Sequence, residues 1–156
     1  NYPKELIYIC PNMQNIKFIG LTNHSLNKGV ISSMLLHFAS SEGFEIDNIE
    51  YNFVDSKKML SLNKDYLSHT TDTDIITFDY SEKNIISAEV YISKDMMLEN
   101  AKVNSQTVED ETVRLVSHAL FHCLGYNDKS PTEKNIMRSK EDEFISAVSR
   151  ETKLNV

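Results

Sequence analysis

Short runs of β-forming residues alternate with longer segments of helical periodicity along this 156-residue chain, and no other feature constrains its fold as strongly. Four runs are rich in β-branched, aromatic and other apolar residues. The polar sequence Ser-Glu-Lys-Asn separates the last two, which predicts a hairpin. The four predicted strands are residues 6–10, 46–54, 74–80 and 85–93.

The remaining segments carry helix start and stop signals. N-cap residues stand before several of them, and Ser130 to Glu133 form a capping box with proline at the first helical position. The five predicted helices are residues 23–42, about 56–67, about 94–101, 108–124 and 131–150. We therefore expect a single α+β domain over residues 1–156, in which a small mixed sheet of about four strands packs with about five helices.

Composition narrows the function classes. Hydrophobic residues make up 40% of the chain, yet no apolar run approaches the roughly 18 residues of a membrane span, so we expect no membrane partner. The net charge of -7 argues against bulk electrostatic binding of nucleic acid, so an RNA partner needs a local basic surface. The two cysteines, Cys10 and Cys123, indicate no disulfide framework and favour a reduced, cytoplasmic protein.

The strongest chemical signal is a pair of histidines on the predicted helix 108–124. His118 and His122 are four residues apart, so both imidazoles lie on one helix face and can reach a single metal ion. Gly125 ends the helix and lets the chain bring Asp128 back to the same ion. Two histidines and one carboxylate leave an open coordination position, as in catalytic zinc sites. The spacing is metzincin-like, but Ala119 occupies the position where a zinc protease has its glutamate base, which argues against peptide hydrolysis.

Further segments accompany this motif. They are Asn63-Lys-Asp-Tyr66, Thr73-Asp-Ile-Ile-Thr-Phe78, Ala88-Glu-Val-Tyr-Ile-Ser93, and the last helix with Met137 and the acids Glu141 to Glu143. With these segments the chain, from about Asn48 onward, resembles the YbeY-type endoribonucleases. These are rRNA maturation factors with a zinc site of the pattern His-x-x-x-His-x-x-Gly-Tyr-x-His.

The resemblance implies a zinc-dependent endoribonuclease that cleaves single-stranded RNA in 16S rRNA 3′-end maturation and ribosome biogenesis. It implies rRNA and the small ribosomal subunit or its assembly proteins as partners. His118, His122 and Asp128 are the expected Zn²⁺ ligands. We expect Arg114, one turn before His118, to stabilise phosphate charge, and Glu89 is a candidate general base.

The chain departs from the family pattern at three of these positions. Asp128 replaces the usual third histidine, which makes Mn²⁺ or Mg²⁺ a relatively better competitor for the site. Leu67 stands where the family often has an arginine, and Arg114 is the candidate replacement for it. Glu89 replaces an aspartate.

Several alternatives remain open. Arg114 can instead pair with Asp110 on its own helix. Lys57, Lys58 and Lys64 can form either an RNA-binding strip or an ordinary solvated face, and His69 either approaches the cleft or is an exposed loop residue. At the level of function, the alternative is a non-catalytic ribosome assembly factor whose metal only stabilises the fold.

Overall fold

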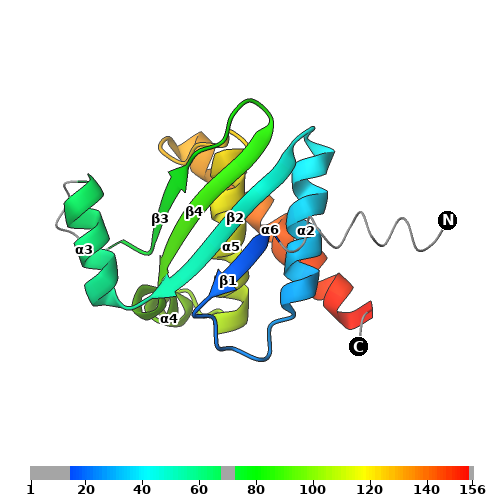
Figure 1. Ribbon diagram of the computed structural model, residues 1–156. Helices are drawn as coiled ribbons and strands as arrows, with labels where there is room; N and C mark the ends of the chain where they lie inside the picture. The colour runs from blue at the N-terminus through cyan, green and yellow to red at the C-terminus, as the bar shows by residue number, and fades with distance from the viewer. Residues whose placement is uncertain (1–14, 68–72, 155–156) are drawn as a thin grey trace.

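A single mixed sheet organises the molecule (Figure 1). The computed structural model describes residues 15–67 and 73–154. The strands of the described part are β1 (Ile16–Ile19), β2 (Glu45–Val54), β3 (Ile75–Asp79) and β4 (Ile85–Ser93). Their order in the sheet is β1-β2-β4-β3. Strands β1, β2 and β4 run parallel to one another, and β3 is antiparallel to β4.

Helices cover both faces of this sheet. They are α2 (Lys28–Ser41), α3 (Ser56–Leu67), α4 (Lys94–Val103), α5 (Val108–Cys123) and α6 (Pro131–Leu154). Helices α2, α5 and α6 share the larger hydrophobic core with one face of the sheet, whereas α3 packs on the other face in a smaller cluster. Among the described residues, no helix has the length and apolarity needed to cross a membrane.

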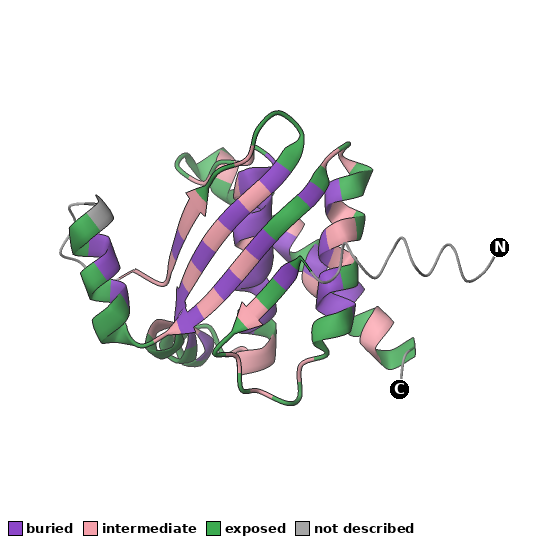
Figure 2. Cartoon of the chain, in the orientation of Figure 1, coloured by how far each residue is buried: buried purple, intermediate pink, exposed green. Residues whose placement is uncertain are grey.

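Strand alternation decides which side chains enter the main core. Ile86, Ala88, Val90 and Ile92 of β4 are completely buried, and the residues between them are partly exposed, which gives the banded strand in Figure 2. The apolar face of β4 therefore packs against the helix layer that contains α5.

Tyr51 of β2 ties this sheet to α5. Its ring is fully buried and stacks on Phe18 of β1, with centroids 5.3 Å apart. Its hydroxyl donates a hydrogen bond to the backbone oxygen of Val116 over 2.9 Å. Burial raises the pKa of Tyr51 well above its usual value, so the phenol stays neutral.

Replacing Tyr51 with phenylalanine removes this one hydrogen bond and keeps the ring. We expect Tyr51→Phe to lower the free energy of unfolding by about 1 kcal/mol. Thermal and denaturant unfolding measure the change. A Tyr51→Phe protein as stable as the wild type contradicts the role given to this bond.

Most predicted elements are confirmed. The hairpin of β3 and β4, the caps at Ser93 and Thr107, and the capping box of Ser130 and Glu133 all form. The α+β class, with four strands and five helices in the described part of the chain, is confirmed as well.

Two boundaries differ at the ends of helices. Helix α2 begins at Lys28 instead of residue 23, because the side chain of Asn27 caps it by accepting from the Val30 N–H. Asn23 instead accepts from the Ser25 N–H in a preceding turn. Helix α6 continues four residues beyond the predicted end, to Leu154.

The strand composition of the sheet also differs from the prediction. Strand β1 was not predicted, because its four residues include the exposed Lys17 and carry little pattern of their own. The predicted strand 6–10, and Cys10 with it, lies outside the described residues.

Candidate metal centre

Helix α5 carries both candidate histidines. Thr107 caps its first turn by accepting from the Asp110 N–H, and the acids Glu109, Asp110 and Glu111 complement the positive end of the helix dipole. Because His118 and His122 are four residues apart, their rings lie together on one face of the helix, with centroids 4.5 Å apart.

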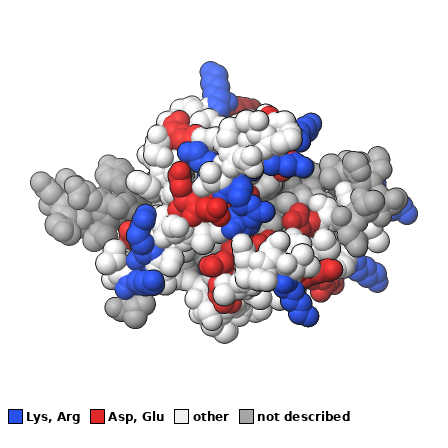
Figure 3. Space-filling view, turned by 180° about the vertical axis from the view of Figure 1, so that it is seen from behind, with Lys and Arg blue, Asp and Glu red and all other residues white. Residues whose placement is uncertain are grey.

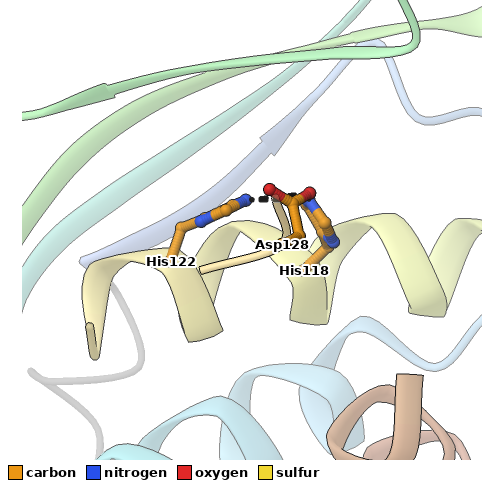
Figure 4. Close-up of side chains that lie close together, drawn as sticks. All are labelled: His118, His122 and Asp128. Carbon is orange, nitrogen blue, oxygen red and sulfur yellow. Dashed lines mark hydrogen bonds and ion pairs between the residues drawn. The ribbon is translucent and has the colours of Figure 1, made fainter. Parts of the chain in front are cut away.

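The end of α5 brings the third residue to this pair. Gly125 has a φ of 103°, a conformation that other residues resist, and the Tyr126 N–H bonds back to the Phe121 carbonyl. The chain therefore reverses, and Asp128 returns beside the two histidines (Figure 4).

This reversal makes Gly125 a test of the site. We expect Gly125→Ala to cost about 1–2 kcal/mol of stability and also to weaken metal binding, because the strained turn displaces Asp128. Gly43→Ala is the matched control. Gly43 also has a positive φ with open space around it, but it lies at the end of α2. Calorimetric metal titration of both variants checks the expectation, and equal metal affinities would contradict it.

The three side chains converge on one point. The Nε2 atoms of His118 and His122 are 3.0 Å apart, and Asp128 Oδ2 lies 3.3 Å from His118 Nε2 and 3.6 Å from His122 Nε2. Metal bonds of about 2.0–2.1 Å in tetrahedral geometry put ligand atoms about 3.3 Å apart. The observed distances bracket this value, so the residues fit a zinc-sized ion. The side chains are 17%, 32% and 39% exposed in the order His118, His122, Asp128, so the site is open to a substrate.

Glu141 of α6 contacts the His118 ring at Nδ1, the nitrogen that does not face the other two candidate ligands. Its Oε2 lies 2.7 Å from His118 Nδ1, so the Nδ1–H donates to the carboxylate and Nε2 is left facing Asp128 and His122. Burial disfavours the charged imidazole, but the hydrogen bond and charge of Glu141, with Asp128 and Asp74, outweigh it and raise the pKa of His118. A metal ion therefore competes with a proton for this ring.

Arg114 is part of the same network. Its Nη1 donates to Glu141 Oε1 and its Nη2 to Asp142 Oδ1, each over 2.9 Å, and its Nε lies 3.8 Å from Glu111 Oε1. The alternative pairing with Asp110 is wrong, because these three acids surround the guanidinium instead. The residue is 8% exposed and both terminal nitrogens are bound to carboxylates. Its geometry supports orientation of Glu141 more than contact with a phosphate.

Two hollows meet at the candidate ligands. A cleft of about 410 Å³ lies between α5 and β3, and a second hollow of about 290 Å³ lies between α4, α5 and α6. Both are bordered by Asp74, Ile75, His118 and Asp128. The Thr73-Asp74 segment thus helps to form the cleft, and the Asp74 carboxylate accepts a hydrogen bond from Asn100.

The structure does not bring Glu89 to the ligands, so its expected place at the site is corrected. Its neighbours on β4, Ala88 and Val90, point into the core shared with α5, and strand alternation therefore turns Glu89 to the opposite face. There its Oε2 accepts a hydrogen bond from Tyr91, 3.0 Å away.

Other candidates lie apart from the centre. Lys57, Lys58 and Lys64 are exposed on α3, which packs on the face of the sheet away from α5. Cys123 is buried, and burial raises the pKa of its thiol to about 12, with the charge of Asp79 adding to the effect. His69 lies outside the described residues.

Glu141 is the residue of this site to which the sequence reasoning assigned no role. It was noted only as part of an acidic helix. The sequence signal for Glu141 is its place in the acidic last helix that also carries Met137. Its contact with His118, 23 residues away, arises only when α6 packs against α5.

Known proteins match most of the chain. A family model described as Endoribonuclease YbeY matches residues 13–149. The protein named Endoribonuclease YbeY from Cytophaga hutchinsonii is 41% identical over 117 residues, covering 74% of this chain and 82% of the relative. Its namesake from Flavobacterium psychrophilum is 42% identical over 115 residues, covering 74% and 79%.

One solved structure shares the fold. The solution structure of TM1509 from Thermotoga maritima aligns with a TM-score of 0.64 at 22% identity, covering 90% of this chain and 93% of that one. At this identity the likeness concerns the fold alone.

Proposed function

Because this chain belongs to the Endoribonuclease YbeY family, we propose that it is a zinc-dependent endoribonuclease whose metal centre consists of His118, His122 and Asp128. The observation that carries this proposal is the convergence of the three ligand atoms at tetrahedral spacing, in a cleft open to solvent. A divalent ion held by three protein ligands supplies a Lewis acid and an activated water, which are what phosphodiester hydrolysis needs.

The chain's own residues have separable tasks in this proposal. His118 and His122 bind through Nε2, and Asp128 contributes an oxygen from the turn after α5. Glu141 holds the His118 ring by its Nδ1–H, and Arg114 holds Glu141, so both are positioning residues. Thr73, Asp74 and Thr77 line the cleft in which the strand to be cut lies.

We further propose single-stranded ribosomal RNA as the substrate, with a role in 16S 3′-end maturation and ribosome biogenesis in the cytoplasm. The family membership supports this choice. Acidic and basic side chains are interspersed on the face seen in Figure 3, and the net charge is -7. The small ribosomal subunit or its assembly proteins therefore supply part of the RNA affinity in this proposal.

Removal of the metal tests the proposal. We expect a chelator to abolish cleavage of single-stranded RNA and one equivalent of Zn²⁺ per chain to restore it, while duplex RNA is cleaved more slowly. Adding Mn²⁺ or Mg²⁺ in place of Zn²⁺ tests the metal preference, because the Asp128 carboxylate suits harder ions better than a third histidine does. Full cleavage by the metal-free protein would overturn the proposal.

The assembly-factor alternative gives the opposite pattern in the same experiment. Metal removal then lowers the melting temperature, no preparation cleaves RNA, and RNA binding survives in the folded protein. A peptidase function is disfavoured by Ala119, whose side chain is buried and supplies no general base.

A further inference from the structure

The hollow between α4, α5 and α6 is lined by more residues than the candidate metal ligands. It shares Asp74, Ile75, His118 and Asp128 with the cleft and extends away from them. Its other lining residues are polar or charged for the most part: Asn100, Asn104, Glu111, Arg114, Arg138 and Glu141, with Leu115. An RNA strand that enters the cleft can therefore continue past His118 and Asp128 into a second polar space.

The carboxylates of this hollow already have partners. Glu141 uses both oxygens, one for Arg114 and one for His118. The Asp74 carboxylate accepts from Asn100, and Asp128 faces the two histidines. Glu111 is 3% exposed, and its Oε1 forms an ion pair with Arg114 Nε over 3.8 Å. The acids therefore oppose an incoming anion less than their number suggests.

Arg138 differs from Arg114 in its exposure and in its contacts. It is exposed on α6, one turn before Glu141, and lines the hollow. Within residues 15–67 and 73–154 its guanidinium makes no hydrogen bond and no ion pair within 4 Å, although its charge acts on Glu111. It is thus an unpaired arginine beside the candidate metal centre, whereas the terminal nitrogens of Arg114 are occupied.

We propose that Arg138 binds an RNA backbone phosphate next to the one that is cut, and that the hollow is the subsite for that nucleotide. This inference rests on the proposed function. A guanidinium matches the geometry of phosphate oxygens, and an exposed arginine with no partner can turn to meet them at little cost. The amides of Asn100 and Asn104 offer donors and acceptors to the sugar and base of the same nucleotide.

The test is the binding of a short, fluorescently labelled single-stranded RNA to the metal-loaded protein, followed by anisotropy between about 50 and 200 mM salt. The RNA is checked for intactness after each titration. The variants are Arg138→Ala, Arg138→Lys and Arg150→Ala. Arg150 is a matched control because it is also an exposed arginine of α6, but it borders a groove against α2 that excludes the metal ligands.

We expect Arg138→Ala to bind RNA about tenfold more weakly at the lowest salt. We also expect the slope of log K against log salt concentration to lose about 0.7, the value of one single-strand phosphate contact. Arg138→Lys keeps the slope, and Arg150→Ala matches the wild type. An Arg138→Ala protein with wild-type affinity and slope overturns the inference alone. A wild-type protein that neither binds nor cleaves RNA overturns the proposed function and this inference with it.

Discussion

Replacing His122 with alanine is expected to abolish RNA cleavage, with a loss of about a thousandfold or more. Its Nε2 is one of three atoms that converge at 3.0 to 3.6 Å, and without it two ligand residues remain. A site with two protein ligands holds a divalent ion too weakly to keep it at the low free concentrations found in cells. The loss follows because the ion contributes several kcal/mol to the transition state. Cleavage of single-stranded RNA and metal content measure both effects.

The matched control is His37→Ala. His37 is an exposed histidine of α2 that contributes nothing to the cleft beside β3. It should leave metal content, cleavage and thermal stability unchanged, and His122→Ala should remain folded but lose the stability that bound metal contributes. Residual cleavage by His122→Ala at the wild-type rate would remove this histidine from the mechanism.

Replacing Glu141 with glutamine is expected to weaken metal binding by about 10- to 100-fold. The buried carboxylate accepts from His118 with one oxygen and from Arg114 with the other. A glutamine has one oxygen and one NH₂ group, so one of these donors must then face another donor. The His118 ring loses its fixed orientation, or Arg114 loses a partner, and the site binds metal less tightly.

Because Glu141 acts through His118, its effect is separable from that of a ligand. At saturating metal, Glu141→Gln should recover most of the cleavage rate, whereas His122→Ala should not. Glu143→Gln, which changes an exposed acid on the same helix, is the control. Unchanged metal affinity in Glu141→Gln would contradict the role given to this carboxylate.

Local signals predicted most of the fold. The Ser-Glu-Lys-Asn connection between two β-rich runs identified the β3–β4 hairpin, and the cap at Thr107 together with Gly125 bounded α5 within a residue or so. Strand β1 escaped prediction because four residues carry too little periodicity. The predicted start of α2 was wrong because three residues before it, Asn23, Ser25 and Asn27, can each act as the N-cap. Only tertiary context selects Asn27.

The sequence likewise predicts the placement of some site residues and not of others. The spacing of His118, His122 and Asp128 follows from helix geometry and a glycine turn, so the sequence is sufficient to predict their convergence. The pairing of Arg114 with Glu141 and Asp142 depends on how α6 docks on α5, which no local pattern encodes. The misplacement of Glu89 was avoidable, because Ala88 and Val90 already mark the core face of β4 as the opposite one.

One measurement tests the central claim most directly: zinc stoichiometry and cleavage of single-stranded RNA, determined on the same preparations of the wild type and His118→Ala. A metal centre at His118, His122 and Asp128 requires one metal ion per chain and metal-dependent cleavage for the wild type, and neither for the folded variant. A variant that keeps a full equivalent of metal, or that cleaves RNA as fast as the wild type, would contradict it.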